Sequence, residues 1–313
     1  MRKYILSIIL ISSLVLNGCD YKKKDKSVPD FMPAEEYTGQ DYNPNSDDKA
    51  MTNPPVTKKD KKFLKENKTE FEKLVKQFYK KNFDLNVKIT NIKPLSRCGV
   101  RVFFHCNDKN IVFDSFHEFD KSDLNNKKKA LKVNDEYSEN LVMDVISGFE
   151  YRAQKEKYDN LFHYLAKNKN KYHYTGYTKE ALRNTIGDGY ENEYFNISGY
   201  PVTIEEYHQY FEPLLYLNQR DFKNNYENAK KLISTDYKNT LRTNLFSKRK
   251  DYTRHNNHST VLKMAKEIKS RKKDMPEDTE IHLEFQEDKL ETKQPYWGNM
   301  NPTSYGIFTE VDD

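Results

Sequence analysis

One long apolar stretch opens the chain, and the polar remainder contains nothing like it. Residues 4–16 are almost continuously apolar, and Arg2 and Lys3 precede them. As a helix, the apolar run from Ile5 to Leu16 would rise only about 18 Å, whereas the hydrocarbon core of a bilayer is about 30 Å thick. A basic start followed by a short apolar run predicts a secretory signal peptide and not a transmembrane anchor.

The apolar stretch ends in Leu16, Asn17, Gly18 and Cys19, which resembles the lipobox of bacterial lipoproteins. The resemblance implies that the signal peptide, residues 1–18, is removed and that the Cys19 sulfur receives a diacylglycerol with palmitate-type chains. Two acyl chains anchor a protein essentially permanently, because each buried methylene contributes about 0.8 kcal/mol. We therefore expect a lipid-anchored protein on the extracytoplasmic face of the cell membrane. The alternatives are an ordinary signal peptide with a coincidental cysteine, or a short buried helix.

Residues 19–57 have the composition of a linker. They contain five of the eleven prolines and no sustained apolar period, so we expect a lipid-anchored tether with a reach of about 30 to 37 Å. A tether has no need of Phe31, Met32 and Tyr37, which leaves open that residues 32–40 pack on the folded domain.

The same stretch carries a family resemblance. Residues 31–40 read Phe-Met-Pro-Ala-Glu-Glu-Tyr-Thr-Gly-Gln. This block is similar to one in uncharacterised staphylococcal-type lipoproteins, a domain of unknown function, where a charged helix and a Val-rich strand follow. Here residues 76–80 and 87–89 match those features, and the likeness extends from residue 1 to about 245. No activity is assigned to that family, so the resemblance implies location and fold but no catalytic residue.

The folded part needs an aromatic core. Hydrophobic residues make up 36% of the chain and its mean hydropathy is −1.00, but 23 Tyr and 18 Phe supply large buriable surfaces. Basic residues number 53 against 48 acidic ones, a net charge of +5. Such a small excess on a long chain excludes nucleic acid as the expected partner.

Hydrophobic spacing predicts helices and strands along the rest of the chain. The predicted elements are a helix over 71–79, a strand over 85–89, a hairpin over 100–116, a helix over 141–149 continuing through 165, a helix over 204–215 that Pro213 ends or kinks, a helix over 222–233, a strand over 241–246, a helix over 261–268 that Pro276 stops, and a strand over 281–285. Local pairings with helices between them favour the α+β class. We expect a helix, an antiparallel sheet and further helices in one elaborated domain, residues 58–313, with a sub-boundary near 170–200.

Cys98 and Cys106 are the other two thiols and a candidate disulfide, which an extracellular compartment permits. If residues 98–106 form one extended strand, the two Cα atoms lie about 26 Å apart. A bridge tolerates about 7 Å, so it requires residues 96–99 to fold back. Two small buried thiols are the alternative.

The remaining polar groups form no known catalytic or metal-binding pattern. His255 and His258 have the spacing of two metal ligands but no third ligand accompanies them. Residues 187–189 read as a turn, and Glu205 and Glu206 would point about 100° apart on a helix. We predict no catalytic residue, metal ligand or cofactor.

Aromatic residues concentrate between Tyr172 and Tyr216. They predict either core packing or a surface that stacks on sugar rings, and core packing is the usual outcome. We therefore expect a surface lipoprotein of unknown activity with a non-catalytic binding or envelope-interaction role and a cell-wall or surface partner. The alternatives are an envelope hydrolase or metal-dependent enzyme, and a glycan-binding module.

Overall fold

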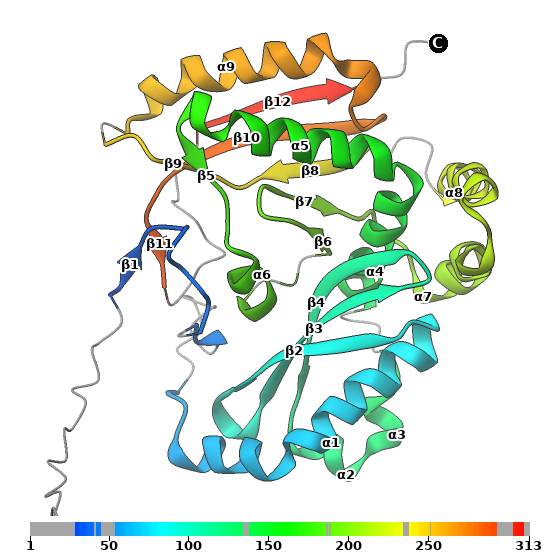
Figure 1. The fold of residues 1–313 in the computed structure, drawn as a ribbon. Coiled ribbons are helices and arrows are strands. Elements are labelled where there is room, and N and C mark those ends of the chain that lie inside the picture. Colours follow the sequence, from blue (N-terminus) through cyan, green and yellow to red (C-terminus); the bar gives the residue numbers. More distant parts are fainter. Residues whose placement is uncertain are drawn as a thin grey trace, which may run out of the picture.

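A computed structural model shows a small sheet and a larger sheet in one domain, with helices around both (Figure 1). It describes residues 29–40, 42–44, 54–133, 138–185, 187, 189–233, 238–250, 252–292 and 303–309. The predicted α+β class is confirmed. Cys19 and the signal peptide lie outside the described residues. Among the helices within the described residues, none is both long and apolar enough to cross a membrane.

Helix α1 (Lys58–Phe83) is the first long element and confirms the helix predicted over 71–79. It begins at a capping box, in which the Thr57 hydroxyl accepts from the Asp60 amide and the Asp60 carboxylate accepts from the Thr57 amide. Its buried stripe faces the small sheet. The helix ends at Asp84, which adopts the left-handed conformation (φ 50°) and caps the last turn.

The small sheet is an antiparallel meander of three strands, β2 (Val87–Pro94), β3 (Val100–Asp108) and β4 (Ile111–Phe119). The predicted hairpin is confirmed, because β3 and β4 pair along their whole length. Lys109 and Asn110 make the turn with φ values of 52° and 62°. Two positive φ angles give the two-residue turn whose twist matches that of the strands.

Several helices follow the small sheet. They are α2 (Lys121–Asn125), α3 (Lys127–Ala130), α4 (Ser138–Ala153), α5 (Lys155–Tyr172) and α6 (Lys179–Thr185). Helix α4 packs on β4. The predicted continuation through residue 165 is wrong in one respect, because the helix breaks at Gln154 and α5 starts afresh. The backbone at Gln154 leaves the helical region (φ −119°, ψ 29°).

The larger sheet is mixed. Its strands are β5 (Tyr174–Thr175), β6 (Tyr190–Glu191), β7 (Phe195–Ser198), β8 (Asn239–Thr243), β9 (Leu245–Ser247), β10 (Thr279–Glu287) and β12 (Thr303–Thr309). Strands β8 and β9 run parallel to β10 along one edge, and β12 runs antiparallel along the other. Helices α5 and α9 (Arg254–Ser270) lie along this sheet (Figure 1). The strands predicted over 241–246 and 281–285 and the helix over 261–268 are confirmed.

The segment predicted as a helix over 204–215 is irregular. A single α turn, α7 (Ile204–Glu206), continues as a π-helical turn, η3 (Tyr207–Phe211), and then as a 3₁₀ turn, η4 (Glu212–Tyr216). Pro213 lies in the first turn of η4, where its missing N–H is tolerated. The regular helix α8 (Gln219–Ile233) follows and confirms the prediction over 222–233.

A short bridge joins the two sheets. The Asp114 amide donates to the Gly189 carbonyl (2.8 Å), and the Gly189 amide donates back to the Asp114 carbonyl (3.0 Å). Gly189 has φ 84°, and a Cβ at this position would lie 2.4 Å from the Ser147 hydroxyl. The close approach of β4, α4 and the start of β6 therefore requires glycine at this position.

An N-terminal strap, residues 29–40 and 42–44, packs across both sheets. Its strand β1 (Phe31–Met32) pairs antiparallel with β11 (Leu290–Glu291). Ala34, Tyr37 and Tyr42 are buried. These residues lie inside the stretch predicted as a linker. The sequence left open whether residues 32–40 pack on the domain, and the structure shows that they do.

Hydrogen bonds hold the strap at both ends. At the larger sheet, the Asp288 carboxylate accepts from the Ala34 amide (2.7 Å). At the small sheet, the Arg101 guanidinium donates to the Tyr42 hydroxyl (2.8 Å). Between these two contacts, the hydroxyl of Thr178, the residue directly before α6, donates to the Tyr37 carbonyl (2.6 Å). The strap is therefore part of the fold and connects its two halves.

Replacing Tyr37 with alanine should destabilise the protein by about 3 kcal/mol, because the ring fills a buried cluster with Tyr177 and Phe246. Phe31→Ala is the matched control, since Phe31 belongs to the same strap but is 56% exposed. Urea unfolding should show a change below about 0.5 kcal/mol for the control. Equal effects of the two substitutions would contradict the role given to the strap.

His117 on β4 is a titratable group inside an aromatic cluster. Its ring lies 4.5 Å from that of Phe78 and 4.4 Å from that of Phe119, and its Nδ1 has no partner among the described residues. Burial lowers the pKa of this imidazole from 6.5 to about 4. The folded protein thus holds the ring neutral where the unfolded chain would bind a proton.

This shift predicts that the free energy of unfolding falls as the pH drops from about 6.5 to about 4, by about 3 kcal/mol at most. His117→Phe keeps the aromatic packing and removes the titrating group. Thermal unfolding at neutral and acidic pH should therefore show a smaller loss for His117→Phe than for the natural chain. Parallel losses in the two proteins would exclude His117 as the cause.

Candidate functional site: a basic groove at the end of helix α1

The exposed face of α1 is strongly basic. The helix contains ten lysines and four acidic residues, and all ten lysines are exposed. The lysines are Lys58, Lys59, Lys61, Lys62, Lys65, Lys68, Lys73, Lys76, Lys80 and Lys81. Of the acids, Asp60 is buried in the capping box, so it offers little to compensate the positive face.

A shallow, open groove of about 680 Å³ lies along the second half of this face. Its lining residues are Thr69, Glu72, Lys73, Lys76, Gln77, Lys80, Lys81, Asn86 and Leu131. Most of them follow one another at helical intervals on α1. Four lysines against one glutamate give the groove a positive character that suits an anionic ligand or surface.

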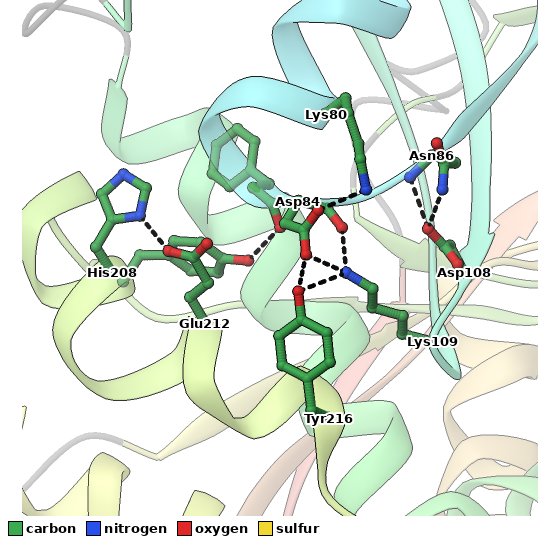
Figure 2. A network of polar contacts seen from close by, with 10 residues as sticks. Lys80, Asp84, Asn86, Asp108, Lys109, His208, Glu212 and Tyr216 are labelled. Carbon is green, nitrogen blue, oxygen red and sulfur yellow. Dashed lines mark hydrogen bonds and ion pairs between the residues drawn. The ribbon is translucent and has the colours of Figure 1, made fainter.

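A polar network adjoins this groove at the end of α1, and Figure 2 shows its centre at Asp84. The Asp84 carboxylate pairs with Lys80 at 2.5 Å and with Lys109 from the β3–β4 turn, and it accepts a hydrogen bond from the Tyr216 hydroxyl. Lys109 also donates to the Asp84 carbonyl (2.6 Å). Three elements far apart in the chain therefore meet at one carboxylate.

Tyr216 is the exposed member of the network. It is 68% exposed, and the Lys109 ammonium lies 4.6 Å from the centre of its ring. That arrangement is a cation–π contact, which holds the ring in place on the surface. Tyr216 ends η4, so the irregular segment positions it beside α1.

Further contacts fix the surroundings of Asp84. The Tyr207 hydroxyl, in the π-helical turn, donates to the Phe83 carbonyl (2.8 Å) and so satisfies a free carbonyl at the end of α1. The Asp108 carboxylate accepts from the Asn86 amide (2.8 Å), and His208 contacts Glu212 at 2.6 Å (Figure 2). The end of α1, the β3–β4 turn and the 207–216 segment form one rigid corner.

The charges of this corner are locked by pairing. Hydrogen bonds from Lys109, Lys80 and Tyr216 hold the pKa of Asp84 well below its usual range. Burial lowers the pKa of Lys109, but the bonds to Asp84 and Tyr216 outweigh it, and the net shift is upward. A general acid, base or nucleophile needs a pKa moved toward neutrality, and both shifts run the other way. Asp84 and Lys109 therefore form a fixed ion pair, and the groove lysines beside them carry the positive charge.

The two candidate disulfide residues are free, buried thiols. Cys98 lies in the short turn η2 (Ser96–Cys98), where its amide donates to the Asp60 carboxylate (2.8 Å). Cys106 lies within β3, about 20 Å further along the extended strand from its first residue, Val100. Burial raises the pKa of the Cys106 thiol to about 12, which makes it unreactive. The turn does not fold back far enough to form a bridge.

The other candidates from the sequence are scattered. His258 is an exposed residue of α9, and the side chain of His255 lies outside the described residues. Within the described part of the chain, no cluster of three His, Cys, Asp or Glu side chains could hold a metal. Glu206 caps α7 by accepting from the Thr203 amide (2.8 Å), whereas Glu205 is exposed.

The aromatic residues between 172 and 216 are mostly buried. Tyr172, Tyr174, Tyr177, Tyr190, Tyr194, Phe195, Tyr200, Tyr207 and Phe211 belong to the core. The hypothesis that this cluster forms a sugar-stacking surface is wrong, because its rings pack on one another and on the sheets. Tyr216 is the exposed exception, and it is held by Lys109.

Sequence reasoning missed Asp84, Lys109 and Tyr216 as a group. The turn containing Lys109 was predictable from its asparagines, and the lysines of α1 were visible as a solvated face. The contact between Asp84 and Tyr216 joins residues 132 positions apart. No local sequence pattern predicts a contact between residues so far apart in the chain.

Comparisons with known proteins give a family but no activity. Residues 24–311 match the family described as protein of unknown function (DUF1672). The fold is similar to the crystal structure of a DUF1672 family protein from Staphylococcus aureus subsp. aureus Mu50, with a TM-score of 0.78 and 34% sequence identity over 90% of this chain and 99% of that chain. No curated protein matches. The resemblance to a staphylococcal-type family of unknown function is confirmed.

Replacing Asp84 with asparagine should cost about 1–2 kcal/mol, because Asn keeps the left-handed backbone but loses two ion pairs. Glu66→Gln is the control on the same helix, since its pair with Lys62 is 3.7 Å long and exposed. That change should cost less than about 0.5 kcal/mol. Urea unfolding at low and high salt measures the loss of stability in each variant. High salt should reduce the difference between the two losses. Equal costs would contradict a special role for the Asp84 network.

Proposed function

The chain belongs to the DUF1672 family, whose description assigns no function, and we propose that this member is a lipid-anchored, extracytoplasmic surface protein with a non-catalytic binding role. The observation that carries the proposal is the sequence of residues 16–19, an apolar residue and a small residue placed before Cys19 at the end of a short apolar leader. Acylation of the Cys19 thiol would supply the membrane attachment.

The position of the strap supports an anchor close to the domain. Pro29 is already part of the fold, because its carbonyl accepts from the Thr292 hydroxyl (2.8 Å). Ten Cα steps join Cys19 to Pro29, and they span at most about 35 Å. A compact chain of this size is roughly 45 Å across. As a flexible coil, these ten residues have a root-mean-square reach of about 16 to 19 Å, against about 30 to 37 Å for a linker over 19–57, so the anchor would hold the domain closer to the bilayer than such a linker implies.

The strap would also fix the position of the domain relative to the membrane anchor. It is held to the larger sheet at Asp288 and to the small sheet at Arg101, so the chain that leaves the membrane enters a rigid body at once. The binding role is supported by the corner around Asp84, where ion pairs and hydrogen bonds fix the side chains, Tyr216 stays exposed, and the adjoining groove is lined by four lysines.

Metabolic labelling with a fatty acid tests the anchor. The natural chain should be labelled and recovered with membranes, whereas Cys19→Ala should lose the label completely. Cys98→Ala and Cys106→Ala are matched controls, since both thiols are buried in the fold and should leave labelling unchanged. An unlabelled natural chain, or a Cys19→Ala variant that keeps its label, would overturn the proposal.

A further inference from the structure

The basic face of α1 is extended by the neighbouring short helix α3. Lys127, Lys128 and Lys129 are all exposed, and Lys127 pairs with Glu70 of α1 at 2.5 Å. Helices α1, α2 and α3 lie together at one end of the molecule (Figure 1). Exposed lysines therefore run along α1 and continue onto α3.

The acidic residues Glu66, Glu70 and Glu72 form ion pairs with lysines of the same face. Glu66 pairs with Lys62, Glu72 with Lys68, and Glu70 with Lys127. Lys73 and Lys76 line the groove, and both side chains are exposed. Because they are three positions apart on the helix, their ammonium groups lie on the same side of α1.

The face carries charge but no large exposed apolar side chain. Within the described residues, the large hydrophobic side chains that are exposed are Phe31, Tyr216 and Leu232, and none of them lies on α1 or α3. A surface of this kind binds anionic groups by electrostatic attraction and does not insert into hydrocarbon. Its binding must therefore weaken steeply with salt.

We propose that the α1–α3 face lies against the anionic headgroups of the membrane to which the chain is anchored. This inference rests on the proposed function, because the short tether keeps the domain at high local concentration beside the bilayer. Each basic residue near an anionic lipid surface adds to the attraction, and a helix lying along the surface presents many of them together. The bilayer is the occupant because the lysines are spread along α1 and onto α3, which suits an extended anionic surface, and because the tether would keep that surface close.

Vesicle binding by the processed chain, residues 19–313, carrying Cys19→Ala, tests this inference without any lipid anchor. Vesicles of phosphatidylcholine alone are compared with vesicles that also contain phosphatidylglycerol, at low and high salt. The chain should partition at least about tenfold more strongly onto the anionic vesicles at low salt, and high salt should abolish the difference.

Two charge-reversed variants locate the binding face. Lys73→Glu with Lys76→Glu should lower partitioning at least about tenfold. Lys263→Glu with Lys266→Glu is the matched control, because both lysines are exposed on α9 at the opposite end of the molecule (Figure 1) and the change in net charge is the same. It should stay within about twofold of the parent. Circular dichroism and thermal unfolding confirm folding, and the milder Lys73→Gln with Lys76→Gln should give an intermediate loss.

Equal losses in the two charge-reversed variants would overturn the proposal, as would equal binding to neutral and anionic vesicles. Tighter binding to soluble polyglutamate than to anionic vesicles would also overturn it and would assign the face to an anionic polymer. The outcome is independent of the acylation test. If labelling fails, the proposed lipid anchor is wrong. If only vesicle binding by the unlipidated chain fails, the proposal that the α1–α3 face lies on the membrane is wrong and the anchor is unaffected.

Discussion

The attachment of the N-terminal strap to both sheets is the constraint on which the rest of the structure depends. Pairing of β1 with β11 brings residues near the two ends of the chain together, and Tyr37 and Tyr42 bury their rings along the path between the sheets. The bridge between Asp114 and Gly189 also links the small sheet directly to the start of β6. Because the strap is also the segment nearest to Cys19, the same residues that hold the fold together determine how far the domain can move from an anchor.

A core built from tyrosine needs partners for its hydroxyl groups, and shared carboxylates supply several of them. The Glu150 carboxylate is fully buried and accepts from the hydroxyls of Tyr158 and Tyr226, each at 2.9 Å. The Glu267 carboxylate likewise accepts hydrogen bonds from the hydroxyls of Tyr164 (2.8 Å) and Tyr172 (2.7 Å). A charged group inside the protein is tolerated when several donors surround it. Tyrosines with such partners can therefore be buried in the two larger core clusters of a chain of low hydropathy.

Local patterns predicted much of the fold, because the side chains of a helix or strand repeat with its geometry. The stripe from Phe71 to Tyr79 gave the helix that became α1, and the alternation over 281–285 gave β10. The irregular turns over 204–216 were not predictable in detail, since Pro213 indicates an interruption but not its form. The Asp84 corner and the pairing of Phe31 with Glu291 depend on contacts between distant residues, which periodicity does not encode.

The central claim is that the chain is joined to the membrane at Cys19, a short distance before the strap. Mass spectrometry of the N-terminal peptide from the membrane-extracted protein tests it most directly. The account predicts a peptide that begins at Cys19 and carries the mass of a diacylglycerol on the Cys19 sulfur. A peptide that begins elsewhere, or one in which Cys19 is unmodified, would contradict it.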